Sequence, residues 1–215
     1  MPRKYITGYV NLGKYYLTEI PEFIKDVEIR GDLIVNHNNL TSLKNSPRIV
    51  MGSFNCHNSK VHTLLGAPDS VHNFFCDKNK IESLEGAPSE VTGTLICSNN
   101  PSLKTLKGAP TKIGNSFYCN YSGLKSLEFG PTVVGSPKNK DEDNEYTCSR
   151  NKLKNLIGSP KVIYGDFYCD ENELESLEGI PEMIYGSLDI SGNRGTKFTK
   201  ADILEVCDVK KRIFL

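Results

Sequence analysis

The sequence predicts a mainly β repeat solenoid, and three recurring features of the 215-residue chain support this fold class. Six cysteines recur at steps of 20, 21, 22, 29 and 21 residues, at Cys56, Cys76, Cys97, Cys119, Cys148 and Cys169. Prolines keep the same period, at Pro47, Pro68, Pro88, Pro110, Pro131, Pro160 and Pro181. A Val or Ile follows each of these prolines by three residues. A fixed period of this length is the sequence signature of stacked structural repeats.

One repeat, residues 160–181, shows how the unit is expected to fold. Four of its residues alternate with polar or aromatic ones and are predicted on one face of a short strand: Ile163, Gly165, Phe167 and Cys169. Leu174 and Leu177 follow a turn, and they must be buried elsewhere in the same coil. Because one coil cannot cover its own apolar face, stacked coils should place their strands in one parallel sheet.

Nine copies of the unit are predicted along the chain. Their strand segments are expected at 8–12, 31–35, 52–56, 72–76, 93–97, 115–119, 144–148, 165–169 and 186–190. We expect a single domain, residues 1–215, with an N-terminal cap and degenerate first repeat in 1–30, repeats in 31–193 and a C-terminal cap in 194–215. The insertion near 135–145 is polar and turn-rich, which predicts a surface loop with partner contact as the second interpretation.

The C-terminal segment breaks the repeat and has the features of a cap. Thr199-x-x-Asp202 is a capping-box-like helix start, with Phe198 and Ile203 as a hydrophobic staple. A short strand is expected from Arg212 to Leu215. Because solenoids expose an apolar end that must be closed, we interpret this segment as the closing element.

The pattern Phe-x-Cys-x-x-Asn-x-Leu resembles the leucine-rich-repeat signature. The period near 21 and the proline-containing return resemble the short bacterial type. The wording Ser-Leu-x-Gly-Ala-Pro followed by Gly-x-Phe-x-Cys resembles small leucine-rich-repeat proteins of tailed bacteriophages. This resemblance implies a leucine-rich-repeat horseshoe with a parallel β-sheet on its concave face. It names no molecular partner, because one fold hosts many functions.

Two further ladders are predicted to be structural. The asparagine column should satisfy backbone groups where each coil turns, with Ser59 and Ser122 filling two gaps. Its members are Asn38, Asn79, Asn100, Asn151, Asn172 and Asn193. The cysteine column exchanges with aliphatic residues in the terminal copies, which favours buried, reduced thiols. We expect no metal site and no cofactor, because the ladder lacks convergent ligands and the histidines at 37, 57, 62 and 72 show no paired spacing.

Charge and composition set limits on function. Lys plus Arg and Asp plus Glu both total 26, so the formal net charge is zero and gives no support for binding nucleic acid or an anionic membrane. No stretch is long and apolar enough to span a membrane, and no signal peptide is evident. The expected compartment is the cytoplasm, which is the host cytoplasm if the protein is phage-encoded.

The residue between the two inward anchors of each strand should point outward and form the candidate binding surface. This column contains no Lys or Arg, but it places Phe75, Ile96 and Tyr118 on successive rungs, with Ile34 and Tyr168 in the same column. A polar rim, including His57, Asp77, Asn120 and Asp170, should flank it. These nine residues are predicted to bind a protein partner on the concave face. The alternative interpretation is that the column reflects β-propensity alone.

The favoured function is therefore a non-catalytic protein-interaction module, and the phage resemblance implies that it binds or inhibits a host protein. The first alternative is a structural or assembly accessory protein of a virion. The second is a cysteine enzyme using Cys207, which lies outside the ladder. No phosphate-binding loop, serine-nucleophile elbow or zinc-helix motif is present.

Overall fold

The computed structural model describes residues 4–138, 144–195 and 197–215, and it is a parallel β-solenoid. Each coil contributes one short strand to each of two parallel ten-stranded sheets. The odd-numbered sheet contains β1 (Lys4–Ile6), β3 (Val27–Ile29), β5 (Ile49–Val50), β7 (Ser70–Val71), β9 (Glu90–Val91), β11 (Lys112–Ile113), β13 (Val133–Val134), β15 (Val162–Ile163), β17 (Met183–Ile184) and β19 (Asp208–Val209). The even-numbered sheet contains β2 (Val10–Asn11), β4 (Leu33–Ile34), β6 (Phe54–Asn55), β8 (Phe74–Phe75), β10 (Leu95–Ile96), β12 (Phe117–Tyr118), β14 (Glu145–Thr147), β16 (Asp166–Tyr168), β18 (Leu188–Asp189) and β20 (Ile213–Phe214).

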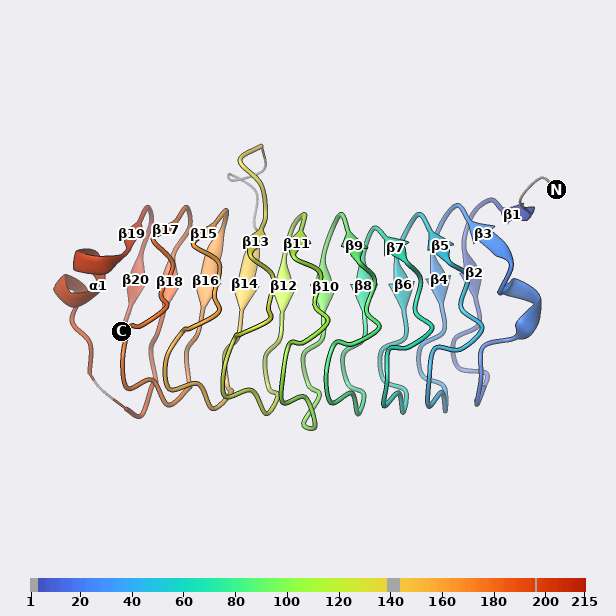
Figure 1. The fold of residues 1–215 in the computed structure, drawn as a ribbon, viewed down its shortest axis with the longest axis horizontal. Coiled ribbons are helices and arrows are strands. Elements are labelled where there is room, and N and C mark those ends of the chain that lie inside the picture. The colour runs from blue at the N-terminus through green and yellow to red at the C-terminus, as the bar shows by residue number, and fades with distance from the viewer. Residues whose placement is uncertain (1–3, 139–143, 196) are drawn as a thin grey trace.

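The coils stack side by side in one elongated row, with the even-numbered strands across the middle of the view and the odd-numbered strands along its upper border (Figure 1). A 3₁₀ turn, η1 (Glu22–Ile24), lies near the N-terminal end, and the only regular α-helix in the described residues, α1 (Lys200–Val206), lies at the C-terminal end. The predicted fold class, a mainly β repeat solenoid with a parallel sheet and a small C-terminal helix and strand, is confirmed. None of the described helices is long and apolar enough to cross a membrane.

The prediction of one strand per coil is wrong in one respect, because the segment from Ile163 to Cys169 forms two strands in different sheets. β15 ends at Ile163, and β16 begins at Asp166 after a bend. A Cβ atom on Gly165 would lie 2.1 Å from the carbonyl oxygen of Asn144, so only glycine permits this close approach between coils. Ile163, Phe167 and Cys169 still point inward and are buried, as the alternation predicted.

The core runs the length of the solenoid between its sides. The odd-numbered sheet contributes buried Val and Ile, the even-numbered sheet contributes buried Leu, Phe and Cys, and the third side contributes mostly Leu. Aromatic side chains pack along this core; Tyr146 lies between Phe117 and Phe167 at ring-centroid distances of 5.2 and 5.3 Å. Backbone hydrogen bonds also join coils on the third side, where the Lys80 amide donates to the Val61 carbonyl at 2.9 Å.

The asparagine column satisfies the backbone where each coil turns, as predicted. The Asn79 Nδ2 donates to the carbonyls of Cys56 and Cys76 at 3.0 and 3.1 Å. Its Oδ1 accepts from the backbone amides of Ser59 and Val61 at 3.2 and 3.0 Å. One side chain thus links neighbouring coils, and the same arrangement recurs at Asn151 and Asn172.

The cysteine column is buried and unpaired, as predicted. All seven cysteines are free thiols, and the six of the column are fully buried behind the even-numbered sheet. Burial raises the pKa of the Cys119 and Cys148 thiols well above the ordinary value. The Sγ atoms of Cys56, Cys76 and Cys97 donate to carbonyl oxygens of the next coil at 3.3–3.4 Å. The column therefore packs as small apolar side chains with weak donors.

The C-terminal segment begins with the predicted capping box. The Thr199 amide donates to Asp202 at 2.7 Å, and the Asp202 amide donates to the Thr199 Oγ1 at 3.2 Å. After α1, β19 and β20 add a tenth rung to both sheets, so this segment also extends the solenoid. The insertion enters after β13 and returns at β14, but its residues 139–143 lie outside the described part of the chain.

A candidate protein interface on the even-numbered sheet

The outward positions of the even-numbered strands form one column, which pairing places in register across all rungs. Phe75, Ile96 and Tyr118 are direct neighbours, because β8 pairs with β10 and β10 with β12 at these residues. Ile34 lies beyond Asn55 on the N-terminal side, and Tyr168 beyond Thr147 on the C-terminal side. The tenth rung adds Phe214, which is 43% exposed and was not part of the predicted column.

The side chains of Phe75, Ile96 and Tyr118 are half-buried, and the pairing register places them on neighbouring rungs of one strip. Parallel strands are about 4.8 Å apart, so three such side chains make a continuous apolar ridge. Burial is the main cause of the raised pKa of the Tyr118 phenol. Thr147 is buried between the two tyrosines, so the ridge is interrupted before Tyr168. The Tyr168 hydroxyl donates to the Asp166 carboxylate at 3.0 Å.

The polar rim lies two residues after this column, where the alternation predicted it. Some of its members bond to one another across rungs. Asn120 accepts hydrogen bonds from the Thr147 hydroxyl and from the Ser149 amide, and the Ser149 hydroxyl donates to Asp170. These contacts hold the rim side chains in fixed positions, which reduces the entropy that a binding partner must overcome.

The rim residue His57 also forms a pair with the corner residue His37, which sequence reasoning missed. The Nε2 atoms of His57 and His37 are 2.9 Å apart, and their rings meet edge to face at a centroid distance of 4.7 Å. The sequence spacing of the four histidines, which shows no pairing, gave no sign of this contact. Their separation of 20 residues is one coil, and His37 lies at a left-handed corner with φ of 53° that turns its ring toward the next rung. Burial is the main cause of the lowered pKa of His57.

A second flanking column, two residues before the apolar one, was also missed by sequence reasoning. It contains Asp32, Ser53, Asn73, Thr94, Ser116, Glu145, Asp166 and Ser187. Several members bond to the backbone of the next coil, as the Asp166 Oδ1 does to the Ser187 amide at 2.6 Å. We call these two flanks and the apolar column, on the rungs from β4 to β18, the even-sheet face.

The even-sheet face is acidic. Its three outward positions per rung include no Lys and no Arg, but they include the carboxylates Asp32, Asp77, Glu145, Asp166, Asp170 and Asp189. Among the described residues, none of these six carboxylates forms an ion pair with Lys or Arg; the ion pairs found there involve other carboxylates. Because the whole chain has no net charge, this absence of cations is a property of one surface.

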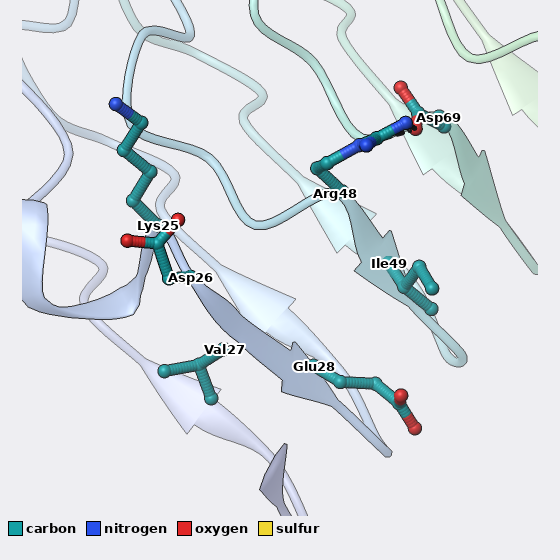
Figure 2. A pocket seen from close by; sticks show the side chains of 7 residues that line it. All are labelled: Lys25, Asp26, Val27, Glu28, Arg48, Ile49 and Asp69. Atoms are coloured by element: carbon teal, nitrogen blue, oxygen red, sulfur yellow. Dashed lines mark hydrogen bonds and ion pairs between the residues drawn. The ribbon is translucent and has the colours of Figure 1, made fainter. Parts of the chain in front are cut away.

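Two hollows over the odd-numbered sheet offer no catalytic arrangement. Figure 2 shows the first, of about 270 Å³, where the Arg48 side chain extends to Asp69 while Lys25 and Asp26 lie together at the other end. Arg48 and Asp69 form an ion pair of 2.6 Å between exposed side chains. The second, of about 800 Å³, lies over β9, β11, β13 and β15 and is lined by polar and apolar side chains, such as Thr92, Lys112 and Tyr164.

Cys207 does not have the surroundings of a nucleophile. Its side chain is 3% exposed, and burial raises the pKa of its thiol to about 11. Reactive cysteines need the opposite, a lowered pKa and an accessible sulfur. No group of three or more His, Cys, Asp or Glu side chains in the described part of the chain could hold a metal ion.

No protein-family model and no curated protein sequence matches the chain. Among solved structures, the chain is similar to YopM from Yersinia enterocolitica WA-314, with a TM-score of 0.37 and 15% sequence identity. The alignment covers 89% of this chain but 62% of YopM, so the chain spans less than two thirds of that protein. The fold described here is therefore defined by its own strand pairing.

Proposed function

We propose that the chain is a protein-interaction module that binds its partner through the even-sheet face. The observation that carries the proposal is the combination of an apolar ridge with flanks that contain carboxylates and no Lys or Arg. Interfaces commonly have an apolar centre within a polar rim. The partner that fits this surface presents an apolar patch surrounded by Lys or Arg.

Electrostatics supports this choice of partner. Opposite charges steer association and fix orientation, and their effect falls as salt increases. A nucleic acid is disfavoured on this face, because a phosphate backbone requires cations that the face lacks. By the phage resemblance, we extend the proposal to a host protein in the infected cell, which the chain would occupy or inhibit.

The proposal is tested by affinity capture from host lysate with three matched forms of the protein. The even-sheet variant is Phe75→Ala with Tyr118→Ala, and the control on the odd-numbered sheet is Val133→Ala with Val162→Ala. We expect a partner that the wild type and the control capture and that the even-sheet variant does not. A partner retained by the even-sheet variant but lost with the control would place binding on the other sheet.

The charge requirement is tested separately on the purified pair. Asp77→Asn with Asp170→Asn neutralises two rim carboxylates without changing their shape. Glu90→Gln with Asp208→Asn is the matched control on the odd-numbered sheet. We expect the rim variant to bind more slowly and with a weaker dependence on salt than the control. Equal salt dependence in both variants would contradict a role for the acidic flanks.

A further inference from the structure

His37 and His57 form a contact that fixes where their protons lie. The Nε2 atoms are 2.9 Å apart, and the Asn58 side-chain nitrogen is 2.8 Å from the His37 Nδ1. If the Asn58 amide donates to Nδ1, His37 must carry its proton on Nε2 and donate to His57. Both rings are then neutral, and the two Nε2 atoms lie side by side at the surface, 2.9 Å apart.

We propose that this pair is a binding site for a divalent transition-metal ion, held between the two Nε2 atoms. Metal–imidazole bonds are about 2.0–2.1 Å long. Two nitrogens 2.9 Å apart therefore subtend an angle of about 90° at the ion, which corresponds to neighbouring positions in octahedral or square-planar coordination. This geometry favours Ni²⁺ or Cu²⁺ over Zn²⁺, for which the nitrogens would have to separate by about 0.4 Å to reach a tetrahedral angle.

The surrounding residues permit the change of protonation that metal binding needs. The His37 proton moves from Nε2 to Nδ1, so no net proton is released and both ligands stay neutral. Rotation of the Asn58 amide by half a turn then presents its oxygen to the Nδ1–H. Metal-bound histidines usually donate their second nitrogen to such an oxygen, which fixes the ring. Asp77 acts on His57 as a nearby negative charge, and Lys78 opposes it more weakly.

Two protein ligands leave the other coordination positions for water. His37 is exposed and His57 is half-buried, so an ion can reach the pair from solvent. No third His, Cys, Asp or Glu of the described chain completes the site. The bound ion should therefore exchange with solvent, and the protein should fold without it. The inference concerns the isolated chain and stands whether or not the even-sheet face binds a protein.

The other two histidines provide matched controls for a direct test. Untagged full-length protein is titrated with Ni²⁺ by calorimetry. We expect one ion per wild-type chain, binding at least about tenfold weaker in His37→Gln and in His57→Gln, and unchanged binding in His62→Gln and His72→Gln. Asn58→Asp should tighten binding, because a carboxylate is a better acceptor for the Nδ1–H and Asp tolerates the left-handed backbone at this position.

A measurement on the wild type removes any dependence on how the variants fold. Paramagnetic Ni²⁺ should broaden the imidazole NMR signals of His37 and His57 at concentrations that leave those of His62 and His72 sharp. The inference is overturned if the wild type binds no Ni²⁺ at millimolar concentration, if the four histidines broaden together, or if His57→Gln binds as tightly as the wild type.

Discussion

On the odd-numbered sheet charges of both signs pair with one another, whereas on the even-sheet face the outward charged side chains are all carboxylates and form no ion pair with Lys or Arg among the described residues. Glu28 pairs with Arg30 at 2.9 Å and Lys161 with Glu182 at 2.8 Å along the odd-numbered side. Both sheets come from the same coils with the same parallel pairing. Strand pairing alone therefore sets neither charge pattern. Several carboxylates of the even-sheet face, such as Asp166, accept hydrogen bonds from the neighbouring coil, and the cationic partner proposed above would account for the absence of Lys and Arg beside them.

The two sheets also differ in what lies behind them. The odd-numbered sheet is backed by β-branched Val and Ile, whereas the even-numbered sheet is backed by Phe, Leu and the six column cysteines. Because of this difference, truncation of the last rung should affect the whole core, changes to the column cysteines should affect only its even-sheet side, and changes to the apolar ridge should affect only the even-sheet face.

Removing residues 198–215 should have the largest effect, because both sheets lose their last strand together. Leu188 and Ile190 would lose the carbonyls of Arg212 and Phe214, and the edges of β17 and β18 would become open. Open edges and an uncovered apolar end favour aggregation. We expect aggregation or a much lower melting temperature by scattering and circular dichroism. Leu204→Ala, on the exposed side of α1, is the control and should melt normally.

A monodisperse truncation with unchanged melting would show that the ninth coil closes itself. It would also show that the two sheets do not depend on a shared C-terminal rung.

Alkaline pH should destabilise the protein through the even-sheet side of the core. Burial raises the pKa of the Cys76, Cys119 and Cys169 thiols, so the folded chain keeps protons that the unfolded chain releases above about pH 9. Protons are then lost on unfolding, and stability falls as pH rises. The slope is about 1.4 kcal/mol per pH unit for each thiol that ionises only when unfolded. Urea unfolding between neutral pH and pH 10 measures it.

The matched comparison is a variant with fewer column thiols. Cys76→Ala with Cys119→Ala should reduce the alkaline slope by the share of two thiols, although its stability at neutral pH is lower. An unchanged slope would mean that tyrosine ionisation, common to both proteins, causes the alkaline loss.

The apolar ridge should affect binding more than stability. Phe75→Ala with Tyr118→Ala opens no internal cavity, because both side chains point outward, and we expect a stability change near 1 kcal/mol or less by urea unfolding. At the centre of an interface the same truncations should cost about 2 kcal/mol or more in binding, measured by calorimetry with the purified partner. A large loss of stability would mean that these residues belong to the core. Unchanged tight binding would move attention to the insertion.

The sequence predicts those features of the structure whose residues repeat along the chain or form a local motif. The cysteine, proline and asparagine columns repeat over many copies, so the solenoid, the inward positions and the register of Phe75, Ile96 and Tyr118 follow from the period alone. The capping box is a local motif with its own geometry, and it too was predictable. Repeated columns and local capping motifs can be recognised from the sequence before the fold is known.

The second sheet and the histidine pair lacked such a signal. Strands of two residues, such as β15, are too short to show the alternation that marks a strand. The sequence pattern therefore assigns the Val or Ile three residues after each proline to the strand that follows, although this residue lies in a separate strand of the odd-numbered sheet. The contact between His37 and His57 occurs once and joins different columns of neighbouring coils. A single contact between the corner residue His37 and the rim residue His57 has no period, and only the coil geometry reveals it.

The smallest effect should separate two serine substitutions within the cysteine column. The Cys119 Sγ donates to the Thr147 carbonyl at 3.4 Å, and the Cys119 amide donates to the same oxygen at 2.9 Å. In Cys119→Ser the hydroxyl can use this acceptor. The Cys169 amide donates to the Asp189 carbonyl at 2.9 Å, but the Cys169 thiol makes no such hydrogen bond among the described residues, so we expect the hydroxyl of Cys169→Ser to be poorly paired in the core. An unpaired buried hydroxyl costs about 1–3 kcal/mol in proteins.

Each serine variant is therefore compared with the alanine variant at its own position, which removes the shared loss of sulfur packing of about 1 kcal/mol. By urea unfolding at neutral pH, we expect serine and alanine to be nearly equal at position 119. At position 169 serine should be the less stable by about 1 kcal/mol or more. If serine is less stable than alanine by the same amount at both positions, the thiol hydrogen bond of Cys119 does not decide whether a buried hydroxyl is tolerated there. A larger penalty at 119 would mean that the shorter serine side chain cannot reach the Thr147 carbonyl.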